Sequence, residues 1–348
     1  TAVLLPDEIA ALLDVCRRVA ERRCGVVLVT HKLAEIKKAA DRVTVLRGGR
    51  VVAASNSPAA DIDALVRAMI DRDADAPPTA AGETAPRPNP SPDRSAATAR
   101  TEVLQVDGLT VRDVHGVTRL DNFTLSLDGG EIVGIAGVEG NGQSELAAVL
   151  SGMMEPTSGR FFVRDLDLTG AGPKAVTDTG MGVVPEDRHA VGCITGMTVA
   201  ENLLLNRLDQ FTRWGFLRRG VVHTSALALM KRFDVRGSGP DAAFSSLSGG
   251  NQQKAVLARE LTLQNLVVLL AAQPTRGLDV GAVAAVYSHI RAASERGVGV
   301  ILISSELDEL ISVAHRVIVL YRGRIMGTCL ADPAQRQRIG AMMAGQAP

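Results

Sequence analysis

Residues 137–144 read GVEGNGQS, a spacing that fits the phosphate-binding loop G-x-x-x-x-G-K-[ST] except at Gln143. The glycines of such a loop let backbone N–H groups approach a phosphate, and a serine at the position of Ser144 can contact magnesium. The lysine of the pattern supplies the positive charge that reaches the outer phosphates, and glutamine carries none. The loop therefore predicts a nucleotide site that lacks its usual phosphate cation.

A second segment, LSGGNQQK (247–254), has the composition of a helix N-terminus. Ser248 suits the N-cap position, and Gly249 and Gly250 leave the N–H groups of the first turn open. The segment therefore predicts another anion-binding surface, offered from the opposite direction to the loop. The alternative interpretation is an ordinary serine N-cap with no ligand.

A third segment, AAQPTRGLDVGA (271–282), directly follows an apolar run. An Asp-Glu pair at the end of such a strand would hold magnesium and polarise an attacking water. Ala272 and Gln273 occupy these two places, and neither side chain is a carboxylate. Ser305 ends a later strand, at the position that is His31 in a related N-terminal segment. These residues predict a site without the usual groups for hydrolysis.

Strand and helix signals place these segments on a common scaffold. Apolar runs predict strands at 103–106, 123–127, 131–137, 182–185, 266–272, 300–304 and 317–321. Helical patterns lie at 143–150, 198–206 and 223–235. This arrangement favours a buried, mainly parallel sheet flanked by helices, with additional helices inserted before residue 245.

Residues 1–52 resemble residues 275–326 without a gap, so that residue n of the first segment matches residue n + 274. A match of this length predicts a duplicated domain. The predicted organisation is a C-terminal fragment of a first copy (1–70), a flexible Pro- and Ala-rich linker (71–100) and a complete second copy (101–348, helical subdomain about 198–265).

Composition limits the function classes. The 348 residues carry 38 basic and 38 acidic side chains, and this balance argues against a nucleic-acid binder. The four cysteines have no C-x-x-C spacing, so we expect neither a zinc site nor a disulfide framework. This cysteine usage favours a protein of the reducing cytoplasm. No apolar run reaches the roughly 18–20 residues that span a bilayer, so we expect membrane contact only through partners. Thr1, which is no initiator methionine, indicates a start within a longer protein.

In their order and spacing, these motifs resemble the nucleotide-binding domains of ABC transporters. The resemblance implies an α/β, P-loop NTPase-like ABC ATPase domain, preceded by a fragment of a second copy. The domain has a mainly parallel sheet flanked by helices, an N-terminal antiparallel β part and an inserted helical subdomain. ATP and Mg²⁺ are the implied cofactors.

The resemblance also assigns roles to individual residues. The nucleotide-binding residues are Gly137, Val138, Glu139, Gly140, Asn141, Gly142, Gln143, Ser144 and Glu186, with Ser144 also as a magnesium ligand. The signature residues are Leu247, Ser248, Gly249, Gly250, Asn251 and Gln252. Asp279 corresponds to the D-loop aspartate, and His31 to the switch histidine of the incomplete first domain.

The segments PEDRH (185–189), LSGGNQQK and AAQPTRGLDVGA look like the second domain of tandem ATP-binding subunits that energise importers of nucleosides and simple sugars. The run AAQPTRGLD favours the nucleoside branch. This resemblance implies contact with transmembrane permease subunits, an indirect link to a substrate-binding protein, and head-to-tail pairing with another nucleotide-binding domain. It also implies a peripheral position at the cytoplasmic face of the cell membrane. No nucleic-acid partner is expected.

In the family, each nucleotide lies between the phosphate loop of one domain and the signature of the other. Because Gln143, Ala272, Gln273 and Ser305 replace the usual lysine, aspartate, glutamate and histidine, we expect a degenerate site and weak or no ATP hydrolysis by this chain alone. The intact signature is expected to complete the competent site. Two alternatives stay open: a nucleotide-binding regulatory or scaffold module that does not hydrolyse ATP, and a soluble ABC ATPase acting on nucleic acid or ribosomes.

The segment FTRWGFLRRG (211–220) combines the only tryptophan of the chain with two phenylalanines and three arginines. Its position in the helical region favours contact with a permease. Binding of single-stranded nucleic acid and a local packing role are the alternatives.

Overall fold

The computed structural model describes residues 6–30, 33–47, 50–58, 60–61, 64–65, 68, 101–278 and 280–346. His31, Asp279 and the predicted linker at 71–100 lie outside the described residues, so the roles assigned to them stay predictions. The chain divides into two compact units, Thr1–Pro86 with Leu278–Ala285, and Arg87–Gly277 with Val286–Pro348.

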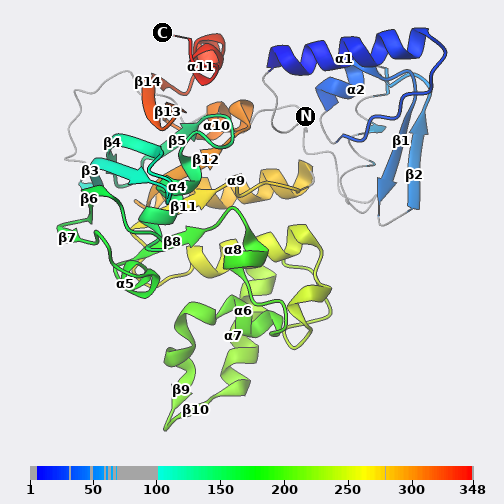
Figure 1. Cartoon of the computed structure of the whole chain (residues 1–348). Coiled ribbons are helices and arrows are strands. Elements are labelled where there is room, and N and C mark those ends of the chain that lie inside the picture. The colour runs from blue at the N-terminus through cyan, green and yellow to red at the C-terminus, as the bar shows by residue number, and fades with distance from the viewer. Residues whose placement is uncertain are drawn as a thin grey trace. The chain divides into compact units, whose positions relative to one another are not determined.

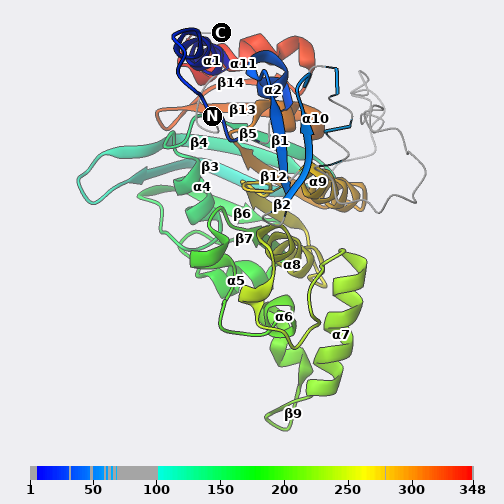
Figure 2. The ribbon, with the colours of Figure 1, turned by 90° about the vertical axis from the view of Figure 1, so that its right-hand side faces the viewer.

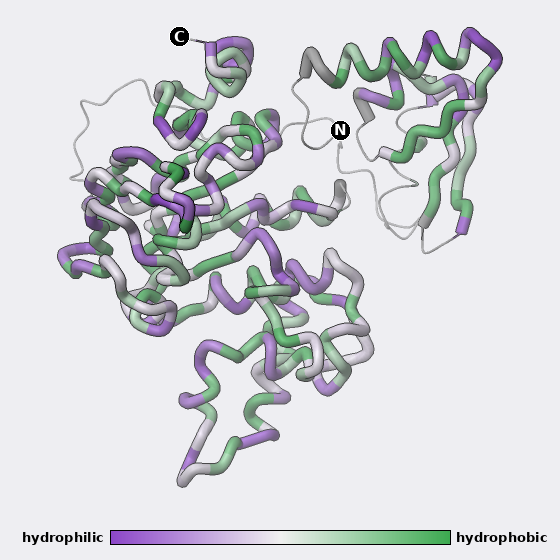
Figure 3. The backbone as a smooth tube through the Cα atoms, viewed as in Figure 1, coloured by the Kyte–Doolittle hydropathy of each residue, from purple (hydrophilic) through white to green (hydrophobic). Residues whose placement is uncertain are grey.

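Among the residues of 6–68 that the structure describes, the first unit contains two helices and a hairpin. Helices α1 (Pro6–Glu21) and α2 (Leu33–Ala39) precede the antiparallel strands β1 (Val43–Arg47) and β2 (Arg50–Ser55). Hydrophobic and hydrophilic residues alternate along α1 (Figure 3), as expected of a helix with one buried face. Leu13 on that helix is 3% exposed.

A six-stranded sheet forms the centre of the second unit (Figure 1). Its order is β14-β13-β5-β12-β11-β8, and every neighbouring pair is parallel except β13 and β14. The strands are β5 (Ile132–Ala136), β8 (Met181–Val184), β11 (Val268–Ala272), β12 (Gly299–Ser304), β13 (Arg316–Tyr321) and β14 (Arg324–Leu330). β5, β11 and β12 are buried along their whole length, which explains their unbroken apolar sequences. The predicted mainly parallel sheet is confirmed, with an antiparallel edge strand that was not predicted.

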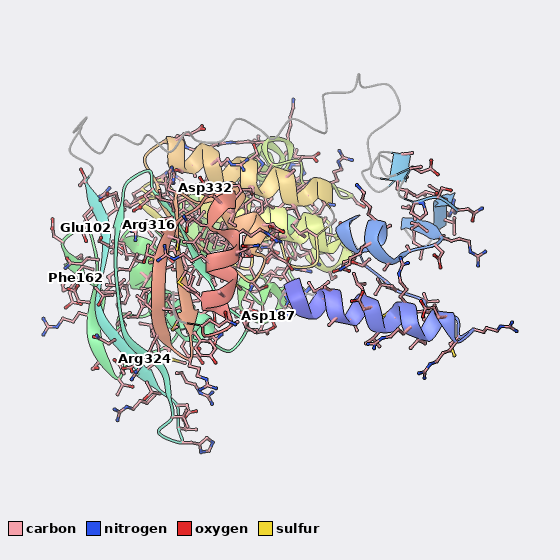
Figure 4. All side chains as sticks on the ribbon, turned by 90° about the horizontal axis from the view of Figure 1, so that it is seen from above. Glu102, Phe162, Asp187, Arg316, Arg324 and Asp332 are labelled. Carbon is pink, nitrogen blue, oxygen red and sulfur yellow. The ribbon has the colours of Figure 1, made fainter. Side chains whose placement is uncertain are left out.

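A second, antiparallel sheet has the order β4-β3-β6-β7. Its strands are β3 (Glu102–Arg112), β4 (Thr118–Asp128), β6 (Ser158–Val163) and β7 (Leu166–Asp167), and Figure 4 labels Glu102 and Phe162 on it. Helix α4 (Gln143–Leu150) has the predicted bounds, and its apolar side chains share one core with both sheets. This core holds the N-terminus of α4 at the end of β5. The predicted antiparallel part is thereby confirmed.

The helical insertion is present, but the predicted helix lengths were wrong. α6 covers only Val199–Leu203, capped by Thr198 and Glu201 in a capping box, and then gives way to the 3₁₀ helix η2 (Leu205–Phe211). Arg207 breaks that segment with a φ of −147°. α7 runs over Arg219–Arg232, beginning and ending earlier than predicted.

A short hairpin that was not predicted, β9 (Thr212–Arg213) and β10 (Phe216–Leu217), joins η2 to α7. The helical part and this hairpin extend away from the two sheets (Figures 1 and 2). The remaining helical segments are α5 (Pro173–Asp178), η1 (Arg188–Gly192), η3 (Phe244–Ser246), α8 (Gly249–Leu261), α9 (Val280–Glu295), α10 (Leu307–Val313), η4 (Pro333–Gln335) and α11 (Arg336–Met343). In the described part of the chain, no helix is long and apolar enough to cross a membrane.

Candidate functional site

The phosphate loop joins β5 to α4, as predicted. Gly140 and Gly142 have φ values of +88° and +105°, a backbone region that favours glycine. A Cβ on Gly142 would lie 2.8 Å from the carbonyl oxygen of Arg119, so the loop packs too closely for a larger residue. Gly142 is the N-cap of α4 and offers no side-chain cap, which leaves the first-turn N–H groups available to an anion.

Gln143 is folded back into this loop. Its side chain is only 8% exposed, and Nε2 donates to the carbonyl oxygen of Val138 at 3.3 Å. The same nitrogen lies 2.2 Å from where a Cβ on Gly137 would stand, so the glycine makes room for it. Gln143 Oε1 is buried and has no hydrogen-bond partner among the described residues. A neutral amide thus fills the place of the lysine.

Asn141 fixes the outer side of the loop to the turn between β13 and β14. Its Oδ1 accepts from the backbone N–H of Arg322 at 2.9 Å, and its carbonyl oxygen accepts from Gly323 N–H at 3.1 Å. The conformation of the loop is therefore set by the sheet as well as by its own glycines.

Glu186 connects the loop to the turn that follows β11. Its Oε2 accepts a hydrogen bond from Ser144 Oγ at 3.3 Å, and its Oε1 accepts one from Arg276 Nη1 at 2.7 Å. Arg276 Nη1 also lies 3.9 Å from Glu139 Oε1 in the loop. The structure brings the predicted Ser144 and Glu186 together. Sequence reasoning assigned no role to Arg276, which stands 90 residues from Glu186.

The end of β11 holds the residues that replace the expected hydrolytic groups. Ala272 is 3% exposed, and Gln273 follows with a φ of +48°. The N–H of Gln273 donates to Ile303 at 2.8 Å, and its side-chain Oε1 accepts from the backbone N–H of Ser305 at 3.4 Å. Gln273 and Ser305, far apart in sequence, are therefore neighbours.

The signature segment begins α8 in the helical part of the second unit. Ser248 is the N-cap, as predicted, but its side chain does not cap the helix. Asn251 Nδ2 donates to Ser248 Oγ at 3.0 Å, and Asn251 Oδ1 accepts from Arg236 N–H at 2.8 Å. Leu247 is 5% exposed and anchors the start of the helix. The first-turn N–H groups of α8 are consequently available to an anion.

Arg188 links the signature to the segment after Glu186, which the sequence did not reveal. Its Nε donates to Gln252 Oε1 at 3.4 Å, and its Nη2 lies 2.8 Å from where a Cβ on Gly249 would stand. Asp187 accepts from the backbone N–H groups of Ala190 and His189, and these bonds lower the pKa of the Asp187 carboxyl. Asp187 therefore caps η1 in its ionised form.

A buried polar cluster lies next to the end of β11. Thr275 Oγ1 donates to Glu309 Oε2 at 2.7 Å, and the phenol of Tyr287 also donates to Glu309. Burial, and then the charge of Glu309, raise the pKa of Tyr287, so its phenol stays protonated. The cluster ties the turn after β11 to α9 and α10.

The β9–β10 hairpin exposes its large aromatic side chains to solvent. Trp214 is 86% exposed and Phe216 is 78% exposed. Local packing therefore does not explain these two residues, and the predicted contact with a permease stays a prediction.

Comparison with known proteins places this geometry in a family. A family model described as ABC transporter matches residues 120–275. The chain is 36% identical over 347 residues to the nucleoside import ATP-binding protein NupA of Lactococcus lactis subsp. cremoris, with 99% of this chain and 66% of the relative covered. It is 37% identical to the ribose import ATP-binding protein RbsA 2 of Rubrobacter xylanophilus, with 99% of this chain and 63% of that relative covered. The chain thus spans between 63% and 66% of the length of these two relatives.

Solved structures show the same fold. The dimeric structure of a post-hydrolysis state of the ATP-binding cassette MJ0796, bound to ADP and Pi, matches with a TM-score of 0.57 at 22% identity. The match covers 66% of this chain and 98% of that one. The fold is therefore that of an ABC ATP-binding cassette. The chain belongs to the ATP-binding proteins of ABC transporters, and within them to the type found in nucleoside, ribose and other sugar importers.

Proposed function

We propose that this chain works as the ATP-binding subunit of an importer for nucleosides or simple sugars, with a site of its own that holds ATP without hydrolysing it. The observation that carries the proposal is the contact between Gln273 and Ser305, where the family pattern has an acid and a histidine. With Ala272 beside them, none of these three side chains can take the proton of an attacking water.

The residues present fit the nucleotide and its metal. The open N–H groups of the loop and of α4 fit the phosphates. Ser144 Oγ and Glu186 Oε2 lie 3.3 Å apart. Neighbouring oxygens of an octahedral Mg²⁺ site lie about 3.0 Å apart when the ligands are at about 2.1 Å, so these two atoms fit with a small adjustment. Mg²⁺ would supply charge neutralisation at the phosphates, and Ser144 and Glu186 would hold it.

The signature gives the chain a second role. Ser248, Gly249 and Gly250 carry an intact anion-binding helix start in a part of the unit separate from the loop (Figure 1). We infer that they complete a competent site on another cassette in head-to-tail pairing, with residues 1–70 as the end of a first copy. The relatives are named as import proteins, which supports permease partners and a place at the cytoplasmic face of the membrane.

Two assays test the proposal. Calorimetry should show ATP binding to the purified chain, while phosphate release stays at the level of the buffer. Turnover by the chain alone would contradict the non-hydrolysing site. Binding of ATP without co-purification of permease subunits would favour the alternative of a regulatory or scaffold module.

The signature role needs its own variant. In the assembled importer, Ser248→Arg should abolish ATPase activity by blocking the helix start, whereas Ser246→Arg, on the exposed side of η3, should leave it unchanged. Equal activity of the two variants would remove the signature from the proposal.

A further inference from the structure

The guanidinium of Arg276 is held at the edge of the phosphate loop by two carboxylates. Glu186 binds it at 2.7 Å and Glu139 lies 3.9 Å away, and the side chains of Arg276 and Glu186 are 57% and 27% exposed. The N–H of Arg276 also closes a turn by donating to the carbonyl oxygen of Gln273 at 3.1 Å. The backbone of Arg276 is therefore fixed beside the site, while its charged end is open to exchange partners.

Gln143, unlike Arg276, offers no charged group to a phosphate at the loop. Its side chain is 8% exposed and bonded inside the loop to Val138, so it neither carries charge nor extends outward. The two carboxylates and one guanidinium at the loop therefore sum to a charge of −1. Nucleotide phosphates are also negative, so metal-free ATP meets repulsion where a lysine would attract it.

We propose that Glu186 and Arg276 make nucleotide binding at this loop dependent on a divalent metal. Ser144 Oγ and Glu186 Oε2 would hold Mg²⁺, and the charge of the metal would repel the guanidinium of Arg276 from Glu186 Oε1. The released guanidinium then pairs with the phosphates, so the turn after β11 supplies the cation that the loop lacks. The metal neutralises the Glu186 carboxylate that Arg276 leaves, and the phosphates pair with the released Arg276 guanidinium. Because each ligand compensates a charge that the other exposes, metal and nucleotide bind cooperatively. This inference rests on the proposed function only in requiring that the loop binds nucleotide.

Calorimetry on the whole chain tests the inference, with ATP titrated in excess Mg²⁺ and again in EDTA. We expect ATP to bind at least about tenfold more tightly with Mg²⁺ than in EDTA. In EDTA the net negative charge at the loop repels the phosphates at close range, whereas Mg²⁺ neutralises it. Glu186→Gln should strengthen binding in EDTA and shrink the Mg²⁺ advantage to about threefold or less. Glu102→Gln, on the antiparallel sheet (Figure 4), makes the same charge change as a matched control and should behave as the wild type.

Arg276 variants separate charge from structure. Arg276→Gln should weaken Mg²⁺-dependent binding by about tenfold, as expected for a lost charge-assisted contact. Arg276→Lys, which keeps the charge, should recover most of the loss, and Arg213→Gln on the β9–β10 hairpin should have no effect. Circular dichroism confirms that each variant is folded.

The outcomes distinguish the two proposals. If the wild type binds ATP equally in Mg²⁺ and EDTA, the metal dependence is wrong and the nucleotide site stands. If Glu186→Gln keeps the wild-type ratio, Glu186 is not the source of the metal dependence and the inference is wrong. If Arg276→Lys binds as weakly as Arg276→Gln, the guanidinium acts through structure and not as a phosphate cation. If ATP binds in neither buffer, the proposed function fails and this inference fails with it.

Discussion

Residues 1–52 and 275–326 have related sequences, and they form the same helices and the same hairpin. α1 (Pro6–Glu21) and α9 (Val280–Glu295) begin and end at matching positions, as do α2 and α10. The hairpins β1–β2 and β13–β14 share a register irregularity, between Val45 and Leu46 in one and between Val319 and Leu320 in the other. These elements form in both regions because their local sequence patterns favour them.

The two regions differ in the apolar segment between their helices. Gly299–Ser304 is strand β12, buried between β5 and β11. The matching residues 25–30 pair with no strand in the described part of the chain, and Val27 and Val29 are 89% and 93% exposed. An apolar run of this kind forms a buried strand only where neighbours satisfy its N–H and C=O groups on both edges. The strand therefore forms only when neighbouring strands of the sheet pair with it, whereas the helices and the hairpin form without them.

The largest effect should come from truncating the matched pair Ile301 and Val27. Ile301 is 0% exposed, so Ile301→Ala should lower the free energy of unfolding of the second unit by about 2–5 kcal/mol. Val27→Ala should change stability by less than about 0.5 kcal/mol. Urea unfolding followed by circular dichroism measures both. Similar losses for the two variants would mean that residues 25–30 are packed as β12 is.

Tyr287, which corresponds to Leu13 in the first region, should give the next largest effect. Tyr287→Phe removes a donor to the half-buried carboxylate of Glu309 and should cost about 1.5–3 kcal/mol in the same assay. Because the pKa of Tyr287 is raised in the folded state, its contribution is complete below about pH 10 and declines as the pH rises further. Stability of the variant should lack this alkaline decline. An equal decline in both proteins would show that Tyr287 titrates normally.

The glycines that open the two matched segments provide a third test. A Cβ on Gly299 would lie 2.6 Å from Val103 Cγ2 and 2.9 Å from Leu127 Cδ2, whereas a Cβ on Gly25 would meet nothing within 4 Å. Gly299→Ala should cost about 1–3 kcal/mol through overpacking. Gly25→Ala should be neutral or slightly stabilising. Thermal denaturation of the two variants compares them directly, and a harmless Gly299→Ala would place β12 further from the antiparallel sheet than described.

The smallest effect is expected at Arg316 and its counterpart Arg42. Arg316 binds Glu131 at 2.7 Å and the carbonyl oxygen of Ser126 at 2.6 Å, while Arg42 is exposed. Arg316→Ala should cost about 1 kcal/mol, and Arg42→Ala nothing measurable. Added salt should reduce the difference in stability loss between the two variants, because the ion pair of Arg316 with Glu131 is partly exposed. A difference that is insensitive to salt would assign the loss to packing.

Sequence reasoning predicted the elements whose signal is local. β5, α4, β11 and β12 were predictable because unbroken apolar runs and a glycine loop mark them. β14 was missed because RIMGTCL is partly exposed and mixes small and polar residues, so no apolar run marks it. The helix at 198–206 was predicted too long because the capping box marks a start, whereas the backbone change at Arg207 has no equally clear signal.

The candidate site was predictable residue by residue but not as a network. The loop and the signature follow from spacing, and the structure pairs Ser144 with Glu186 and Gln273 with Ser305. Arg276 escaped because its partners are distant in sequence and no short motif requires a basic residue there. Contacts of this kind come from the fold of the whole sheet.

At the residue after the matched apolar segment, the first region has His31 and the second has Ser305, which binds Gln273 through its backbone N–H. The two related regions therefore differ in the residue type at this position. We proposed that the loop of the second unit retains ATP without hydrolysing it. The direct test is the chemical identity of the nucleotide that stays bound.

For this test, the chain is loaded with labelled ATP and Mg²⁺, separated from free nucleotide, and the bound label is analysed over time. Gly142→Ala, which would place a Cβ 2.8 Å from the carbonyl oxygen of Arg119, serves as the control with a blocked loop and should retain no label. We expect the label bound to the wild-type chain to remain intact ATP. Conversion of the bound label to ADP and phosphate would contradict this expectation.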